Sequence, residues 1–340
     1  MDARRNRRTM WLAALAAPAM MLVACSGTGD GATGDASSTQ KLTLAHSYNE
    51  DQPQHRCGAQ VIADEVSAAG VGLEVEIFPS SQLGGDADRI ASVASGDIDI
   101  DIQGASALGA VYEPISVLDS AYAFDDADHL ARFMDSDASD TVVDAFAAET
   151  GVHTLGAWSA GARQFTANTP IRTPDDLSGL RMRFPGSPQF LMNAKALGAQ
   201  ATEVAYEELY LALQQGTVDG QENPITNIVA TNIKEVQDYV SLSSHQLNTN
   251  LVIISDIWND LNEEQQEALT AATDKAIAEV TACVDADEAE ILEEWRTGDD
   301  WEVVEDVDRD AFSEKAEEYL SGVLTGDSLT VYEAIRSTSE

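Results

Sequence analysis

Residues 98–103 read IDIDIQ, in which isoleucines alternate with aspartates. Strict alternation of this kind predicts a β-strand with one face in a core. The strings KLTLAHS at 41–47 and GLEVEIFP at 72–79 are also predicted strands. Helical patterns occupy the two intervals, 52–70 and 86–96, and each ends at a glycine. The order strand, helix, strand, helix, strand predicts the α/β class, with helices packed on a sheet.

The composition limits the classes of function. The chain has 340 residues, which is long enough for two domains. Because 44% of the residues are hydrophobic, the chain is not a disordered acidic tail. Its formal charge at pH 7 is −40, from 19 Lys and Arg against 59 Asp and Glu. A nucleic-acid partner is excluded, because binding phosphates requires a positive surface. We interpret most of the acidic residues as a solvated surface.

A local reversal of charge occurs in the second half of the chain. Residues 180–186 read LRMRFPG, a predicted strand in which Arg181 and Arg183 alternate with apolar residues and share one face. With Arg163 and Arg172, four arginines lie in one short stretch. A guanidinium group binds a carboxylate through two parallel N–H bonds. The stretch is therefore a candidate anion site, and the alternative is a solvent-exposed face.

The first residues read as a targeting segment. A basic start, MDARRNRR, precedes an apolar run at 10–24 that is too short for a comfortable membrane span. The string Leu22-Val23-Ala24-Cys25 resembles the bacterial lipobox, which implies cleavage before Cys25 and a lipid on its sulfur. We therefore expect a lipoprotein signal peptide at 1–24 and a flexible, lipid-anchored tether at 25–40. The alternative is an ordinary signal peptide.

Three further patterns concern the architecture. No Pro or Gly interrupts a helical pattern over 262–296, about 50 Å of helix, which we expect to cross two lobes. The string at 152–168 predicts a strand, a glycine-rich bend and a second strand, and NLVIISD at 250–256 predicts another strand. A helix is expected from Asn223-Pro224 to about Asp238. Apart from Cys25, two cysteines remain in an exported chain, which suggests a disulfide between Cys57 and Cys283.

Several longer strings resemble the solute-binding proteins of TRAP transporters (tripartite ATP-independent periplasmic transporters). The resemblance extends over roughly residues 41–320. The strings that carry it are FPSSQLGG at 78–85, GARQFTAN at 161–168, TPDDLSGLRMRFPGSP at 173–188 and YEELYLALQQGTVDGQENP at 206–224. The last of these, with LRMRFP upstream, is a specific signature.

The resemblance implies a two-lobed, type II-like periplasmic-binding fold with hinge strands and a long helix that braces both lobes. We expect lobe I at 41–160 plus 250–290 and lobe II at 161–249 plus 291–335. A small organic acid would bind between the lobes, and no cofactor is implied. The implied partners are the small and large membrane subunits of the transporter. The implied receptor is an extracytoplasmic, lipid-anchored monomer.

The resemblance also implies roles for residues of the second lobe. Arg183 would pair with the ligand carboxylate, Arg163 would be a second cationic contact, Asn223 would hydrogen-bond the carboxylate, and Tyr206 would close over the ligand. The alternatives are a structural ion pair for Arg183, a helix N-cap for Asn223 and plain packing for Tyr206. Trp158 would line the cleft or belong to the core.

The first lobe would supply specificity, because ligands bind at strand ends in α/β sheets. The sialic-acid-binding branch of the family has Glu and Arg after the third strand, where this chain has Gly104 and Ala107, so sialic acid is not expected. Arg181 would face solvent or pair with Asp175 or Asp176. His46 has the alternative role of a buried, hydrogen-bonded histidine. The first-lobe candidates are His46, Ser47, Tyr48, Asn49, Asp86, Gln103 and Ser106.

Two other functions are alternatives to a TRAP receptor. The nearer one is a receptor for another import system with the same type of cleft. The other is a secreted hydrolase, but the five histidines have no metal-ligand spacing such as H-E-x-x-H and no G-x-S-x-G string occurs. We therefore expect a binding protein and not an enzyme. A four-carbon dicarboxylate, a sugar acid and an aromatic or keto acid all remain open as ligands.

Overall fold

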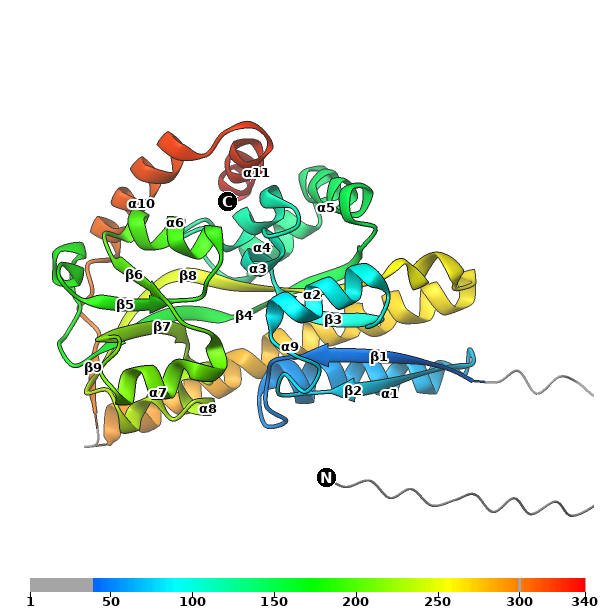
Figure 1. The fold of residues 1–340 in the computed structure, drawn as a ribbon, viewed down its shortest axis with the longest axis horizontal. Helices are drawn as coiled ribbons and strands as arrows, with labels where there is room; N and C mark the ends of the chain where they lie inside the picture. The colour runs from blue at the N-terminus through cyan, green and yellow to red at the C-terminus, as the bar shows by residue number, and fades with distance from the viewer. Residues whose placement is uncertain (1–38, 299–300, 340) are drawn as a thin grey trace, which may run out of the picture. The chain divides into compact units, whose positions relative to one another are not determined.

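The computed structural model describes residues 39–298 and 301–339. The predicted signal peptide, Cys25 and nearly all of the tether lie outside these residues. Within them, the strands form one mixed sheet with the order β2-β1-β3-β8-β4-β7-β5-β6, and β9 pairs with β8 (Figure 1). The strands are β1 (Gln40–His46), β2 (Leu73–Phe78), β3 (Ile100–Gly104), β4 (His153–Ala167), β5 (Arg181–Phe184), β6 (Gln200–Glu203), β7 (Gly220–Pro224), β8 (Tyr239–Ile254) and β9 (Glu302–Val304).

Helices cover both faces of the sheet. Helices α1, α7, α8 and α9 lie on one face, and α3, α5, α6, α10 and α11 lie on the other (Figure 1). This is the layered α/β arrangement that the sequence predicts. The helices are α1 (Gln60–Ala69), α2 (Asp86–Ser95), α3 (Ala105–Leu108), α4 (Ala127–Met134), α5 (Asp137–Thr150), α6 (Pro188–Leu197), α7 (Leu209–Gln214), α8 (Ile225–Ala230), α9 (Glu263–Thr297), α10 (Arg309–Val323) and α11 (Gly326–Ser337).

The sheet has two halves joined by two long strands. In the first half, β1 pairs in parallel with β2 and β3, and in the second half β5 pairs in parallel with β6 and β7. The antiparallel strands β4 and β8, of 15 and 16 residues, run through both halves. Their register shifts between Ser159 and Ala162. The two long strands correspond to the hinge strands expected of a two-lobed fold.

Helix α9 extends along both halves, as predicted. Its 35 residues start after Asn262, whose side chain accepts a hydrogen bond from the Gln265 amide in a capping box. Its first part packs with α1, and Trp295 near its end packs with α7 and α8. The structure also forms the predicted disulfide, because Cys283 of α9 is bonded to Cys57 beside α1.

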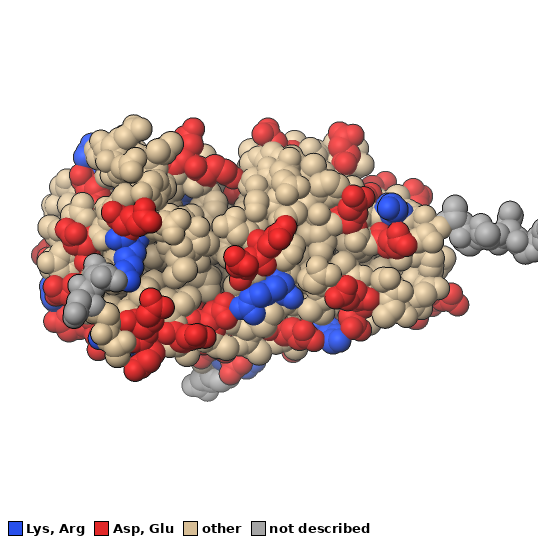
Figure 2. All heavy atoms as spheres, turned by 90° about the horizontal axis from the view of Figure 1, so that it is seen from below, with Lys and Arg blue, Asp and Glu red and all other residues tan. Residues whose placement is uncertain are grey.

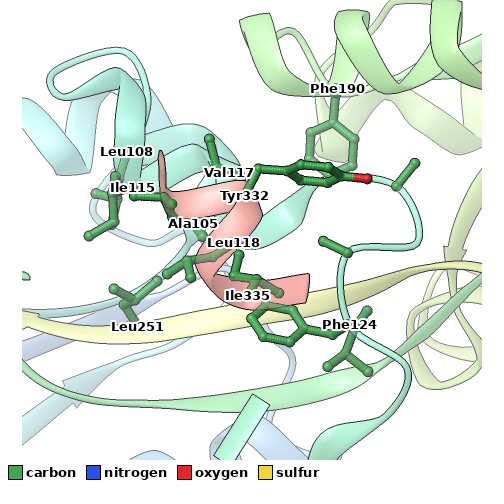
Figure 3. Packing of buried hydrophobic residues seen from close by; sticks show 14 of the residues in the cluster. Ala105, Leu108, Ile115, Val117, Leu118, Phe124, Phe190, Leu251, Tyr332 and Ile335 are labelled. Atoms are coloured by element: carbon green, nitrogen blue, oxygen red, sulfur yellow. The ribbon is translucent and has the colours of Figure 1, made fainter. Parts of the chain in front are cut away.

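The last helix differs from the predicted lobe assignment. Tyr332 and Ile335 of α11 lie in one cluster with Val117, Leu118 and Phe124 (Figure 3). Helix α11 therefore packs against α5 and the turn that carries Val117 and Leu118, segments that we expected in lobe I. The predicted boundaries at residues 160 and 249 fall inside β4 and β8. The exact division of the chain into lobes stays a prediction.

Three sequence predictions of local structure were wrong in part. The string 152–168 forms one strand, β4, with a bulged register, and β8 begins at Tyr239, well before the predicted strand at 250. The segment after Asn223 forms only the short helix α8 and then a separate turn at Ile233–Glu235. The first part of β8 was not predicted, because it contains polar residues such as Ser243 and His245 that interrupt the alternation of apolar and polar residues. Neighbouring strands and helices bury these side chains.

The surface carries many more acidic than basic side chains. Figure 2 shows acidic residues distributed over one face of the molecule, with few basic residues between them. This distribution agrees with the interpretation of the acidic residues as a solvated surface. Among the residues described, no helix combines the length and apolar content required to cross a bilayer.

Glu288, a half-buried residue whose Oε1 atom is buried, lies against the irregular part of β4. Gly161 has φ +96°, and a Cβ atom there would lie 2.2 Å from Oε1 of Glu288 in α9. A side chain at this position would therefore be strained and would collide with Glu288. Burial, and to a smaller extent the charge of Asp285, raises the pKa of Glu288 to about 8. Glu288 is thus neutral over much of the range in which an exposed glutamate is ionised.

We expect Glu288→Gln to reduce the loss of stability between pH 5 and pH 8. The unfolded chain ionises from about pH 4.5 while the folded chain keeps the proton to about pH 8, so stability is fully present below the first value and falls toward the second. Glutamine does not titrate, so between pH 5 and pH 8 the free energy of unfolding of Glu288→Gln should fall by about 1–3 kcal/mol less than that of the wild type. Urea unfolding at three pH values measures this, with exposed Glu290→Gln as control. Equal slopes for Glu288→Gln and wild type would contradict the expectation.

Candidate functional site

A cavity of about 610 Å³ lies where the carboxyl ends of the parallel strands meet. Its lining comes from both halves of the sheet: from the segments after β1 and β3 and the start of α2, and from the segments after β5 and β6, the end of β7, and β8. Strand ends of this kind are the usual ligand site of open α/β sheets. The volume is in the ordinary range for a small-molecule site, roughly 300–1,000 Å³.

Arg183 is a buried cation in the cavity wall. Met182 and Phe184 of β5 are buried in the core, and Arg183, on the opposite face of the strand, is 1% exposed. Its Nε donates to the carbonyl of Val204 at 2.9 Å, whereas its Nη1 has no partner. Burial lowers its pKa to about 10. Within the described part of the chain, no carboxylate forms an ion pair with Arg183, so its charge is available to an anion.

Arg163 is different, because its charge is already compensated. Its guanidinium binds both carboxylate oxygens of Glu222, and its Nη1 donates to Oδ1 of Asn248 at 2.6 Å. Burial would raise the pKa of Glu222, but Arg163 and His245 outweigh it, so the net pKa is lowered. The ring of Phe190 lies 4.8 Å from the guanidinium carbon. Arg163 and Glu222 thus form a buried, bidentate ion pair at the cavity.

Asn223 and Tyr206 lie beside the two arginines. Asn223 is inside β7, opposite Gln164 of β4, so it is not the N-cap of the following helix. Its Oδ1 accepts from Nη2 of Arg163 at 3.1 Å, and its Nδ2 donates to Gln221 at 2.6 Å. Tyr206 starts a short turn after β6, and its buried hydroxyl has no partner. Burial raises the pKa of that hydroxyl.

The first half of the sheet contributes further polar side chains to the lining. The hydroxyl of Tyr48 donates to Oδ1 of Asn250 at 2.7 Å, and Nδ2 of Asn250 has no partner. Ser47 donates to Oδ1 of Asp86 at 2.9 Å. Gln103 lines the cavity near the end of β3, and its Oε1 accepts from the Gly104 amide at 2.9 Å. Ser106 lines it at the start of α3, where its backbone amide donates to Asp119.

Two of the candidate residues are buried outside the cavity lining. Trp158 is 1% exposed and packs in the core beside α9, with ring atoms 3.2 Å from the place of a Cβ atom on Gly58. Of the two roles expected for Trp158, the structure supports the core role and not the cleft lining, because its side of β4 faces α1 and α9. His46 is fully buried, and it bonds His55 and the Tyr48 amide. Burial lowers its pKa to about 3, so it is a neutral residue that supports Tyr48.

Two exposed candidates also lie outside the cavity lining. Asn49 accepts a hydrogen bond from Ser80 at 3.1 Å on the surface. Arg181 pairs with Asp219 through two bonds of 2.6 and 2.9 Å, and not with the two aspartates expected from the sequence. The two arginines of LRMRFPG therefore separate, because Arg181 lies at the exposed start of β5 and Arg183 lies one strand period deeper.

Sequence reasoning missed several residues of the lining. Asn248 belongs to the part of β8 that was not predicted as a strand, and Asn250 is the first residue of the strand that was predicted at 250–256. They lie two residues apart, so a period-2 reading of HQLNTN would have placed them on one face. Asn227 of α8 also lines the cavity and accepts from Gln52 at 3.1 Å. Glu222 was part of a recognised string, but nothing in the string indicates that it neutralises Arg163.

Taken together, the lining can bind a small anion between two halves of one sheet. Three buried polar atoms without partners belong to it: Nη1 of Arg183, the hydroxyl of Tyr206 and Nδ2 of Asn250. Each of them can donate a hydrogen bond, and one carries a positive charge. Among the described residues, no group of three or more His, Cys, Asp or Glu side chains could hold a metal ion. The fold and site define a two-lobed solute receptor.

Comparison with known proteins gives the family. The model of the DctP family, bacterial extracellular solute-binding proteins of family 7, matches residues 44–325, so the chain belongs to this family. It is 32% identical to the sialic acid-binding periplasmic protein SiaP of Vibrio cholerae, over 69% of this chain and 74% of that one. It is 29% identical to the 2,3-diketo-L-gulonate-binding protein YiaO of Escherichia coli, over 81% and 84% of the two chains.

Solved structures agree with this assignment. A TRAP periplasmic solute-binding protein of Roseobacter denitrificans with bound L-galactonate superposes with a TM-score of 0.81 at 28% identity, covering 88% of this chain and 99% of that one. One from Polaromonas, bound to D-erythronate, gives 0.81 at 29% identity, with 87% and 98% coverage. The predicted TRAP resemblance and two-lobed α/β fold are confirmed. The family is one of extracytoplasmic solute receptors.

Proposed function

We propose that this protein binds a small organic carboxylate in the cavity and delivers it to the membrane subunits of a TRAP transporter. The observation that carries the proposal is Arg183, a fully buried guanidinium with a free Nη1 and no carboxylate partner among the described residues. An uncompensated buried cation is costly, and a ligand carboxylate removes that cost. L-galactonate and D-erythronate, bound by two structural relatives, belong to the same chemical class.

In this proposal, each candidate residue of the second half has a separate role in binding the carboxylate. Arg183 pairs with the carboxylate, and Asn223 and Tyr206 add hydrogen bonds. Arg163, already paired with Glu222, holds Asn223 in position through its bond to Oδ1. A ligand that touches both halves favours the closed arrangement by its higher affinity for it. Closure would occur about β4 and β8. The two lobes would be divided as the sequence predicts, except that α11 would belong to lobe I, with the segments against which it packs.

Calorimetric titration with a panel of monocarboxylates, dicarboxylates and keto acids tests the proposal. We expect at least one acid to bind, and at about 100 times its Kd it should raise the free energy of unfolding by about 2.7 kcal/mol. Recovery of the acid unchanged after prolonged incubation is expected as well, because the protein acts by binding and not by catalysis. The absence of binding by every acid would refute the proposal, and consumption of the acid would point to the hydrolase alternative.

We also propose that the receptor is anchored to the membrane through a lipid on Cys25. The support is the lipobox-like string Leu22-Val23-Ala24-Cys25 and the Gly- and Ser-rich segment that follows it. We expect Cys25→Ser to release the protein from membranes or to leave it unprocessed, because the acyl chains supply the membrane affinity. Fractionation of cells that express each form measures this. A processed Cys25→Ser protein that still sediments with membranes would show that the lipobox interpretation is wrong.

A further inference from the structure

A buried ion-pair network lies behind the first-half wall of the cavity. Arg89 of α2 is fully buried, and its Nε donates to Oδ1 of Asp101 at 3.0 Å. Its Nη2 donates to Oδ1 of Asp86 at 2.9 Å, and its Nη1 donates to the carbonyl of Gly84 at 2.8 Å. Asp101 of β3 is itself fully buried. One guanidinium therefore holds two carboxylates, of which only Asp86 reaches the cavity.

The Oδ2 atom of Asp86 is available as a hydrogen-bond acceptor. Both Arg89 and Ser47 donate to its Oδ1, whereas Oδ2 makes no hydrogen bond within residues 39–298 and 301–339. The side chain of Asp86 is 47% exposed. A carboxylate oxygen only accepts hydrogen bonds, so the partner that suits Oδ2 is a hydroxyl or N–H group. A second carboxylate in this place would bring two acceptors of like charge together.

The cations of the lining allow for one anionic group. Arg163 is neutralised by Glu222, which leaves Arg183 as the uncompensated cation of the described lining. In the first half, Arg89 faces two aspartates. Burial raises the pKa of Asp101 to about 7, so the network carries one negative charge or none as Asp101 loses or keeps its proton. In neither state does it offer a positive charge to a ligand.

We propose that the cavity selects a monocarboxylate with several hydroxyl groups over a dicarboxylate, with Asp86, held by the buried Arg89, accepting from a ligand hydroxyl. The proposal rests on the proposed function and names the class of acid. Nδ2 of Asn250 is a donor without a partner, and it suits the oxygen atom of such a hydroxyl. The acid would span the cavity with its carboxylate on Arg183 in the second half and its hydroxyls toward the first half.

Matched pairs of ligands give a direct test. An aldonate and the aldarate of the same sugar differ only at the last carbon, which is a CH₂OH group in one and a carboxylate in the other. We would titrate such pairs with four, five and six carbons, together with succinate, into the intact protein at pH 7.5. For the tightest pair we expect the aldonate to bind at least 30-fold more tightly than the aldarate.

The variant Asp86→Asn removes the charge and keeps the shape. We expect it to weaken aldonate binding about tenfold and to reduce the ratio between aldonate and aldarate to less than fivefold. The matched control is Glu76→Gln, which makes the same change in net charge at an exposed position of β2 outside the lining. The ratio in that control should equal the wild-type ratio. An unchanged ratio in Asp86→Asn would overturn the role of Asp86.

The remaining outcomes separate this inference from the proposed function. An aldarate or succinate that binds as tightly as the aldonates would overturn the inference and leave the carboxylate receptor intact. The same holds if only an aromatic or keto acid binds. If no carboxylate of any class binds to the wild-type protein, both the inference and the proposed function are overturned.

Discussion

Replacing Arg183 with alanine is expected to weaken carboxylate binding by more than about 2 kcal/mol, or roughly 30-fold. The guanidinium is 1% exposed, so an ion pair with a ligand there is shielded from water. The same substitution should leave the ligand-free protein at least as stable as the wild type. Arg183 makes no ion pair among the described residues, and its removal eliminates a buried charge. Loss of binding without loss of stability is the signature of a ligand contact.

Calorimetry with the tightest acid and urea unfolding without ligand provide the two measurements. The control is Arg181→Ala, which removes the neighbouring arginine of the same strand, an exposed residue paired with Asp219. This control should keep wild-type affinity. Near-native affinity in Arg183→Ala would reject Arg183 as the main carboxylate contact and would move that role to Arg163.

Arg163→Ala should have the opposite profile, with a loss of about 3–5 kcal/mol in the free energy of unfolding. Glu222 is fully buried, and Arg163 supplies both of its charged hydrogen bonds and the larger share of its electrostatic stabilisation. Without Arg163, the carboxylate keeps His245, whose Nε2 lies 3.4 Å from Oε2, as a weaker partner, so it must stay charged with less compensation or take up a proton. Asn223 also loses the donor that orients its Oδ1, so binding should weaken as a secondary effect.

A second substitution separates the two contributions. In the Arg163→Ala, Glu222→Gln double variant no buried carboxylate remains unpaired, so a substantial part of the lost stability should return. Urea unfolding of the single and double variants measures this. If Arg163→Ala is as stable as the wild type but no longer binds the acid, then Arg163 is a direct ligand contact and its pairing with Glu222 contributes little to the fold.

Features that depend on local periodicity could be predicted from the sequence. The alternation in IDIDIQ predicted β3, and the absence of Pro and Gly after Asn262 predicted α9 to within a residue at each end. Arg183 and Asn223 were recognised because each lies in a specific string, and both line the cavity. These signals are short in sequence and do not depend on what the neighbouring elements contribute.

Features that depend on tertiary partners could not be predicted. Glu222 and Arg163 are 59 residues apart, and only the pairing of β4 with β7 brings them together. The face of β4 that carries Trp158 could not be predicted, since both faces of a central strand are buried. Similarly, the pattern at 86–96 predicted a helix but not the burial of Arg89 against Asp101, which comes from the packing of α2 on β3.

The division of the lining between the halves of the sheet has a consequence for how such receptors diversify. The proposed carboxylate contacts, Arg183 and Asn223, come from β5 and β7, whereas Asp86, Gln103 and Ser106 come from a separate, contiguous part of the chain around α2 and β3. A substitution in the latter changes what lies opposite the carboxylate and leaves the arginine and its supports in place. Recognition of the acid group and recognition of the rest of the molecule can therefore be inherited, exchanged or engineered as separate modules.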